Sequence, residues 1–205
     1  MKRLTQAGRI PKLMVFLDSP MATRITEVFQ HHPELLDPEP RALIERGDSP
    51  FDFPGLKVVR TVDESKALNS LKGTAVIIAG SGMCTGGRIK HHLATNISRP
   101  ESAVLFVGYQ ASDTLGRQLV DGAKEARILG QTYPVRARIM QISGFSAHAD
   151  RDELVRWLSG LRSRPKRLFV THGEPATARS FAEHVRGRMG WEVAVPGYGE
   201  TAELV

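Results

Sequence analysis

The segment Ala75–Ala79 limits the possible fold more than any other part of this sequence. It is a continuous apolar run, rich in β-branched residues, with Gly73 before it and Gly80 directly after it. An uninterrupted run of this kind fits a parallel strand that is covered on both faces, because a strand with one face in water alternates apolar and polar residues. The run therefore predicts an α/β fold.

Strand-like and helix-like stretches alternate along the whole chain, which is typical of a mostly parallel sheet flanked by helices. Strands are predicted at 13–17, 56–60, 75–79, 103–107, 126–129, 135–142, 167–171 and 192–195. Two helices are predicted to begin at residues 20 and 62, and a third to run through 89–93. Three more are predicted at 114–122, 150–161 and 176–189. The two strands between 126 and 142 are expected to form a hairpin with 130–134 as its turn.

Two of the helix starts carry capping signals. Ser19 is expected as an N-cap with Pro20 at the first helical position, where its missing N–H costs nothing. Thr61 and Glu64 match a capping box, in which each side chain accepts from the other residue's backbone N–H. The residues expected to face the core from these two helices are Ile25, Val28, Phe29, Ala67, Leu68 and Leu71.

Composition narrows the class of protein. The chain has 205 residues, of which 41% are hydrophobic, enough for a real core. The single cysteine, Cys84, excludes an intrachain disulfide and a thiolate zinc cluster, which fits a reducing compartment. There is no apolar run of about 18 residues and no signal-peptide pattern, so we expect a cytoplasmic protein without membrane contact. The net charge of +6 suggests a polyanionic partner, although a solvated basic surface explains it equally well.

A glycine-rich loop, Gly80–Arg88, joins the strongest predicted strand to a helix. Glycines let backbone amides approach a ligand, and a helix N-terminus favours an anion, so the loop suits a phosphate. Ser81, Thr85 and Arg88 add further donors. The loop lacks both the lysine of a P-loop and the spacing of a dinucleotide fingerprint, so binding of a nucleotide cofactor is a weaker alternative. The alternative without any ligand is that the loop is only a tight turn.

Two histidines lie at the ends of predicted elements. His148 comes just before a helix with Asp150 as its expected N-cap, and His172 ends a short apolar strand. Loops at the carboxyl ends of parallel strands are where α/β proteins bind ligands. The seven histidines form neither H-x-H-x-D-H nor H-E-x-x-H. Adjacent pairs at 31–32 and 91–92 project about 100° apart on a helix and cannot easily share one ligand.

The order of the motifs resembles the β-CASP metallo-β-lactamase ribonucleases. The resemblance covers essentially the whole chain, and the ordered set is specific although each motif alone is weak. The matching segments are Leu17-Asp18-Ser19-Pro20-Met21-Ala22, Gly80-Ser81-Gly82-Met83, Gly86-Gly87-Arg88, His91-His92-Leu93, Gly144-Phe145-Ser146-Ala147-His148-Ala149-Asp150, Thr171-His172-Gly173-Glu174 and Val195-Pro196-x-Tyr198-Gly199-Glu200.

The resemblance implies a fold, a mechanism and roles for matching residues. Residues 1–145 would form a β-CASP domain without its opening part, and 146–205 the closing αβ segment of a metallo-β-lactamase fold, an RNA specificity region. His148 would lie at the scissile phosphate as an acid or transition-state stabiliser, and His172 would bind zinc. The implied reaction is hydrolysis of RNA phosphodiesters by zinc-activated water. The residues expected along the RNA path are Ser81, Gly82, Met83, Gly86, Gly87, Arg88 and Ser146.

The sequence also departs from the family pattern, because the H-x-H-x-D-H half is absent. One zinc ligand is too few for a zinc site, so the chain is expected to be inactive alone and to need an N-terminal metallo-β-lactamase half or a homologous subunit. A non-catalytic RNA- or protein-binding module of β-CASP type is the alternative. The closing segment should expose a sheet edge, which predicts a homo-oligomer.

Overall fold

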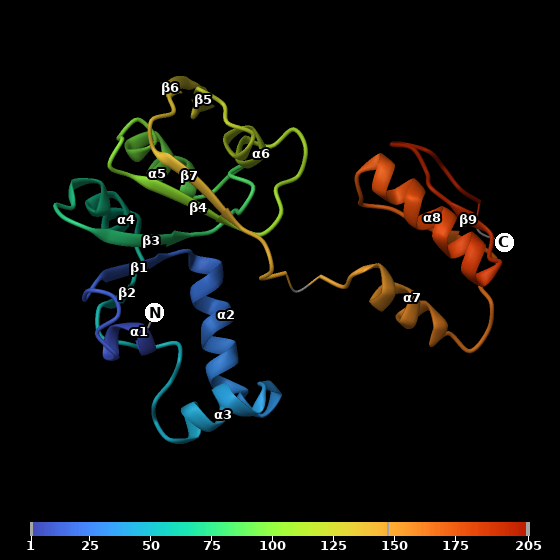
Figure 1. The fold of residues 1–205 in the computed structure, drawn as a ribbon, viewed down its shortest axis with the longest axis horizontal. Helices are drawn as coiled ribbons and strands as arrows, with labels where there is room; N and C mark the ends of the chain where they lie inside the picture. Colours follow the sequence, from blue (N-terminus) through green and yellow to red (C-terminus); the bar gives the residue numbers. More distant parts are fainter. Residues whose placement is uncertain (1, 147, 204–205) are drawn as a thin grey trace. The chain divides into compact units, whose positions relative to one another are not determined.

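The computed structural model describes residues 2–146 and 148–203, and these fall into two compact units, Met1–Ser143 and Gly144–Val205 (Figure 1). The motif residue Ala147 lies outside the described residues. Within the described ranges, no helix is long and apolar enough to cross a membrane.

The first unit contains a three-stranded parallel sheet with β1 (Met14–Asp18) between β2 (Leu56–Val58) and β3 (Ala75–Ala79). A short helix, α1 (Lys2–Gln6), precedes it. The β1–β2 connection holds α2 (Pro20–His31), a 3-10 turn (Pro33–Leu35) and α3 (Pro38–Glu45); the β2–β3 connection holds α4 (Val62–Ala67) and a 3-10 turn (Leu68–Ser70). Phe16, Val59 and Leu68 form the buried cluster here. The carboxyl ends of β1 and β3 lie in register, which places Asp18 opposite Ala79.

A second parallel pair in this unit joins β4 (Ala103–Val107) to β7 (Arg138–Ile142). It is accompanied by α5 (Ile89–Asn96), by α6 (Leu115–Val120) and by an antiparallel hairpin of β5 (Glu125–Ile128) and β6 (Gln131–Pro134). One face of the pair packs into a core with the two helices and the hairpin. Its buried members are Cys84, Leu93, Ile97, Phe106, Leu119, Ala126, Ile128 and Ala137.

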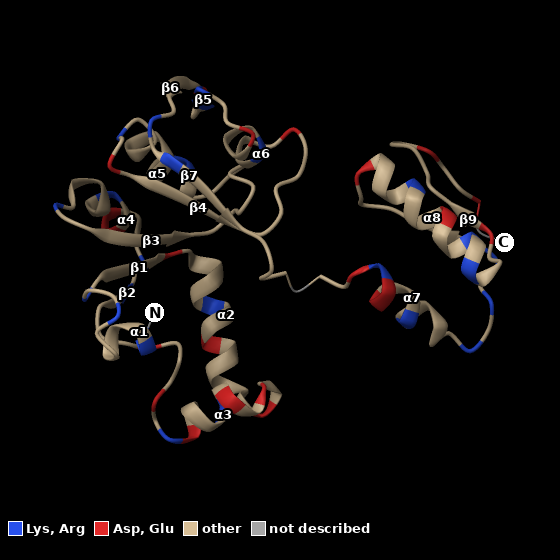
Figure 2. Cartoon of the chain, in the orientation of Figure 1, with Lys and Arg blue, Asp and Glu red and all other residues tan. Residues whose placement is uncertain are grey.

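The second unit is smaller. It contains α7 (Arg151–Ser159), β8 (Leu168–Phe169), α8 (Pro175–Met189) and β9 (Val193–Ala194), with β8 and β9 paired in parallel. Its core is formed by Leu158, Ala182, Val185 and Val193. The loop that follows α7 is basic, whereas α7 itself carries both basic and acidic residues (Figure 2); the basic residues of the loop are Arg162, Arg164, Lys166 and Arg167.

The α/β class and both capping predictions are confirmed. The Ser19 hydroxyl accepts from the Ala22 N–H at 3.3 Å, with Pro20 opening α2. At α4, Thr61 accepts from the Glu64 N–H and the Glu64 carboxylate accepts from the Thr61 N–H, both at 3.1 Å. The parallel arrangement is confirmed in part, because the strands of the described residues form four small sheets rather than one.

The predicted hairpin was placed wrongly. Leu129 and Gly130 both have positive φ, 51° and 85°, which makes a two-residue turn between β5 and β6. Residues 131–134, expected as the turn, are therefore a strand. β7, expected to pair with 126–129, pairs in parallel with β4 instead.

The prediction of which residues of the first two helices are buried was also partly wrong. Leu68 is buried as expected, but Ala67 and Leu71 are exposed. On α2, Ile25, Val28 and Phe29 are exposed, because the helix extends away from the β1–β3 sheet and buries only Thr23 near its start (Figure 1). Ile78 of β3 is likewise exposed, so that strand is not covered on both faces as predicted.

Candidate functional site

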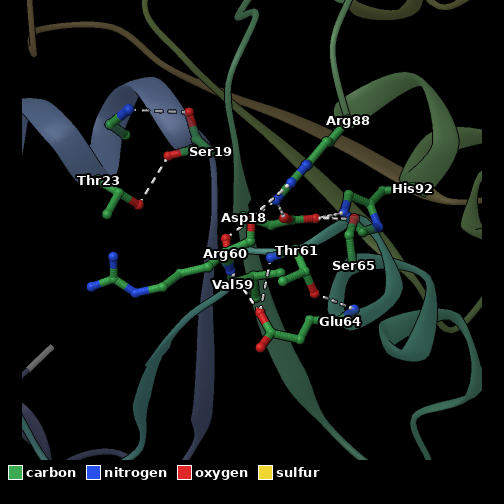
Figure 3. A network of polar contacts seen from close by, with 11 residues as sticks. Asp18, Ser19, Thr23, Val59, Arg60, Thr61, Glu64, Ser65, Arg88 and His92 are labelled. Carbon is green, nitrogen blue, oxygen red and sulfur yellow. Dashed lines mark hydrogen bonds and ion pairs between the residues drawn. The ribbon is translucent and has the colours of Figure 1, made fainter.

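The carboxylate of Asp18 is the centre of a polar cluster at the carboxyl end of β1 (Figure 3). It is fully buried and accepts three hydrogen bonds: from the Ser65 hydroxyl at 2.6 Å, from His92 Nε2 at 2.6 Å and from Arg88 Nη1 at 2.5 Å. Ser65 comes from α4, His92 from α5 and Arg88 from the end of the glycine-rich loop. A buried carboxylate is stable only when it is paired and hydrogen-bonded, and this one is.

The protonation of Asp18 is governed by two opposing effects. Burial disfavours the charged form and by itself would raise the pKa of this carboxyl. The hydrogen bonds from Ser65, His92 and Arg88, together with the positive charge of Arg88, outweigh it, so the pKa of Asp18 is lowered from its ordinary value of 3.8. The cluster therefore contains a carboxylate, with Arg88 as its counter-charge.

Arg88 also donates to two backbone carbonyls, Val59 O at 3.2 Å and Arg60 O at 3.3 Å. Its side chain is 19% exposed, so most of the guanidinium is turned toward protein. The sequence predicts Arg88 as a phosphate ligand, and the structure places its donors on the carboxylate and on the chain after β2. A contact between Arg88 and phosphate stays a prediction.

The loop that Arg88 closes has a defined shape. Ser81 and Cys84 adopt positive φ values of 65° and 57°, and Gly87 has 72°. The Ser81 hydroxyl accepts from the Gly86 N–H at 3.3 Å, and the Ser81 backbone carbonyl accepts from the Cys84 N–H at 2.8 Å. Left-handed conformations at residues other than glycine are uncommon and persist where the surroundings hold them. Among the predicted phosphate ligands, Ser81 and Gly86 are thus in contact with each other.

Met83, at the middle of the loop, is bonded to the segment after β4 and to the first turn of α6. Its carbonyl accepts from the Gly116 N–H at 3.0 Å, and its sulfur lies 3.2 Å from the Ala111 N–H. Gln110, also buried, lies against Gly116 so closely that a Cβ there would come within 1.9 Å of Gln110 Oε1. Gly82, by contrast, is exposed and has open space around its α-carbon.

In the second unit, His148 lies on the short segment before α7 and is exposed. Its backbone N–H donates to the Ser146 hydroxyl at 3.1 Å, so Ser146 shapes this segment. Two residues later, Asp150 caps α7 in a capping box with Glu153, as Asp150 accepts from the Glu153 N–H at 2.9 Å and Glu153 from the Asp150 N–H at 3.0 Å. The predicted N-cap is confirmed. The His148 backbone is therefore bonded to Ser146 and lies two residues before the capped start of α7.

His172 follows β8 and is also exposed. Its φ of 63° lies in the left-handed region. Residues other than glycine are uncommon in this region, although histidine adopts it more often than most, and such backbone conformations gather at functional sites. The convergence of His148 and His172 on one groove with the glycine-rich loop stays a prediction.

The described residues do not fit a complete zinc site. Zinc in proteins takes three or four side-chain ligands from His, Cys, Asp or Glu, and no group of three such residues in residues 2–146 and 148–203 is arranged to hold a metal ion. His172 cannot bind the metal tightly by itself. No catalytic step through zinc follows from this chain alone.

Family comparisons decide what kind of chain carries these features. The model described as the Beta-Casp domain matches residues 1–119, more than half of the chain. The chain belongs to the β-CASP family. A second model, described as the Zn-dependent metallo-hydrolase RNA specificity domain, matches residues 132–196 of this β-CASP chain. The resemblance seen in the order of the motifs is confirmed.

Curated relatives of the β-CASP chain include enzymes and a transcription factor. Ribonuclease TTHA0252 of Thermus thermophilus is 39% identical over 196 residues, which cover 96% of this chain and 44% of the relative. Transcription termination factor FttA of Methanocaldococcus jannaschii is 35% identical over 188 residues, 89% of this chain and 30% of the relative. An RNase J-like protein of the same organism is 30% identical over 177 residues, which cover 86% of this chain and 39% of the relative. The chain spans less than half the length of these relatives.

No pattern in the sequence predicted that Ser65 and His92 would both contact Asp18. Asp18 and His92 were part of the matching motifs of the β-CASP chain, but they are 74 positions apart and no local pattern links them. His91 and His92 are adjacent in one motif, yet their environments differ: His91 is exposed, while His92 is buried against Asp18. The available signal was an aspartate directly after an apolar strand, where a buried charge requires partners.

Proposed function

We propose that this β-CASP chain supplies the RNA-binding part and the phosphate-site histidine of a zinc-dependent nuclease that hydrolyses RNA phosphodiesters in the cytoplasm. The observation that carries the proposal is the pair of family matches, a β-CASP domain followed by an RNA specificity domain of zinc-dependent hydrolases. The similarity to a protein named ribonuclease over 96% of this chain supports it further.

The residues of the chain have separate roles in this proposal. The loop Gly80–Arg88 faces the RNA backbone, and its glycines let the phosphates approach the main chain. His148 lies at the scissile phosphate and donates a proton to the leaving oxygen or stabilises the charge of the transition state. His172 contributes one zinc ligand. The remaining ligands come from an N-terminal metallo-β-lactamase half or from a homologous subunit, so the chain alone does not cleave RNA.

A reconstitution assay tests the proposal. The chain is mixed with the metallo-β-lactamase half of a β-CASP relative, zinc and a labelled RNA, and cleavage is followed over time. We expect cleavage by the mixture and by neither part alone. Replacing His148 by Ala should lower the cleavage rate by about 100-fold or more, because a positioned acid–base group contributes about 10² to 10⁴.

His31→Ala is the matched control. His31 is an exposed histidine on α2, outside the proposed site, so this variant should cleave at the wild-type rate. Equal rates for His148→Ala and the wild type would refute the role of His148. Cleavage by the chain alone would refute the dependence on a second part.

The second candidate is a non-catalytic module that holds RNA or a partner protein. It is favoured by the observation that His172 is the single zinc ligand the resemblance assigns to this chain. The module binds RNA with an affinity that falls as salt rises, because phosphate contacts release counterions. RNA binding by the reconstituted mixture without any cleavage would favour this candidate over the nuclease.

A further inference from the structure

The glycine-rich loop packs against the corner where β1 meets α2 at its start and is hydrogen-bonded to that corner at its end. At its start, Gly80 lies so close to Ser19 that a Cβ at Gly80 would be 2.7 Å from the Ser19 hydroxyl. At its end, the Arg88 guanidinium lies 2.5 Å from Asp18. The two corner residues are neighbours in sequence, so the separation of the loop's ends is set by one short piece of backbone.

The corner itself is held from several elements. Ser65 on α4 and His92 on α5 both donate to the same Asp18 oxygen at 2.6 Å, which fixes the orientation of the carboxylate (Figure 3). Arg88 reaches past Asp18 to the carbonyls of Val59 and Arg60 beyond β2. The carboxylate therefore links β1, α4, α5 and the loop in one hydrogen-bonded unit.

We infer that Asp18 is a positioning residue, which holds the loop Gly80–Arg88 in its ligand-binding shape by orienting Arg88. The inference rests on the proposed function, because it concerns how the proposed RNA-binding loop is kept in place. Asp18 cannot touch RNA itself, since its side chain is fully buried. It acts through Arg88, whose guanidinium is the sole polar link from the loop to the carboxylate among the contacts of the described residues.

Because Asp18 is negatively charged, an effect of its position on RNA binding can be distinguished from an effect of its charge. Removing a negative charge from a protein that binds a polyanion should strengthen binding, because the repulsion of phosphates is reduced. Loss of a positioning residue should weaken binding instead. The replacement Asp18→Asn, which keeps the shape of the side chain, therefore gives opposite signs for the two roles.

The experiment uses the full 205-residue chain and two measurements. The first is amide hydrogen exchange at Cys84 and Gly86, whose N–H groups are bonded to Ser81 inside the loop. In Asp18→Asn we expect their exchange to accelerate by about tenfold or more beyond any acceleration of the β5–β6 hairpin amides, which report the stability of the unit as a whole. The second is the affinity for a fluorescent single-stranded RNA, which we expect to fall about fivefold or more.

Asp63→Asn is the charge-matched control. Asp63 is an exposed aspartate in the first turn of α4 and has no part in the cluster. This variant should leave loop exchange unchanged and bind RNA as well as the wild type or more tightly. If Asp18→Asn does not fold, Arg88→Met tests the same link from the other side and should accelerate exchange at the same two amides.

A double variant tests whether Asp18 acts through Arg88. If it does, Asp18→Asn combined with Arg88→Met should exchange at Cys84 and Gly86 no faster than Arg88→Met alone, because the same link is lost only once. Exchange in the double variant that is faster by the product of the two single effects would overturn the inference. So would wild-type exchange rates at Cys84 and Gly86 in Asp18→Asn, or an acceleration of the loop and hairpin amides by the same factor. If the wild-type chain binds no RNA, the proposed function fails while the exchange data still decide the role of Asp18.

Discussion

Asp18 and Arg88 are 70 positions apart in sequence, yet their side chains meet at 2.5 Å in the interior of the first unit. The pair connects the end of β1 to the end of the glycine-rich loop. Both residues belong to segments that carry the β-CASP resemblance, so the pair joins two of these segments in space. A buried charge that loses its partner is strongly destabilising, which makes the pair a sensitive point for mutation.

The first prediction concerns acid stability. Because the pKa of Asp18 in the folded chain lies below its ordinary value of 3.8, its contribution to stability is present above that value and is lost as pH falls through the lower folded pKa. At pH 7, Asp18→Asn should unfold more easily by about 3 kcal/mol. The difference between the variant and the wild type should shrink in acid. Urea unfolding at several pH values measures it, and a difference independent of pH would contradict the prediction.

The second prediction concerns the packing below the loop. Gly116→Ala would place a Cβ 1.9 Å from Gln110 Oε1 and 3.2 Å from the Met83 carbonyl oxygen, where buried Gln110 has little room to move. We expect a loss of about 2 kcal/mol in the free energy of unfolding, since overpacking costs about 1–3 kcal/mol. Thermal or urea unfolding measures it.

Gly187→Ala is the control for that measurement. Gly187 is exposed inside α8, has a helical φ and has open space around its α-carbon. The same chemical change should therefore stabilise the chain by up to about 1 kcal/mol, because alanine is the better helix former. Equal effects at the two positions would show that the contact with Gln110 does not control stability.

The third prediction concerns the single cysteine. Cys84 belongs to the glycine-rich loop and is buried in the core of the first unit, and burial raises the pKa of its thiol to about 11. The reactive thiolate is therefore scarce at neutral pH, and the sulfur is covered. We expect a thiol reagent to label the folded chain at pH 8 at least about 100-fold more slowly than the urea-unfolded chain. Comparable rates in the two states would show that the loop opens readily.

The fourth prediction concerns self-association. The register of β4 and β7 places Leu105 beside Met140 and Val107 beside Ile142, and all four side chains are exposed on one face. Parallel sheets are normally covered on both faces, and exposed apolar patches associate. We expect the isolated chain to form dimers or larger species in light scattering as its concentration rises.

The double variant Val107→Thr with Ile142→Thr tests that face directly. Threonine keeps the β-branched shape that suits a strand while removing apolar surface. The variant should remain monomeric at concentrations where the wild type associates. A wild-type chain that stays monomeric throughout would contradict the prediction, and equal association of both chains would place the contact elsewhere.

Local chemistry in the sequence predicted much of the secondary structure. Ser19 and Thr61 mark helix starts because their side chains bond to amides three residues away, and this needs no distant partner. The apolar, β-branched run at Ala75–Ala79 favours a strand by its composition, and that strand pairs with β1. The hairpin was misplaced because its turn depends on positive φ at Leu129, a residue type that does not signal such a turn.

The sequence alone determined the family of this protein, because the motifs and their order along the chain identify the family and neither depends on coordinates. It also identified the glycine-rich loop and the two histidines as candidates. Only the tertiary structure decided that Arg88 is bonded to Asp18, and that His92 rather than His91 is buried beside it. An aspartate directly after an apolar strand signals that a buried charge needs partners, but the order of residues does not identify the three elements that converge on its carboxylate, because those partners are found in space.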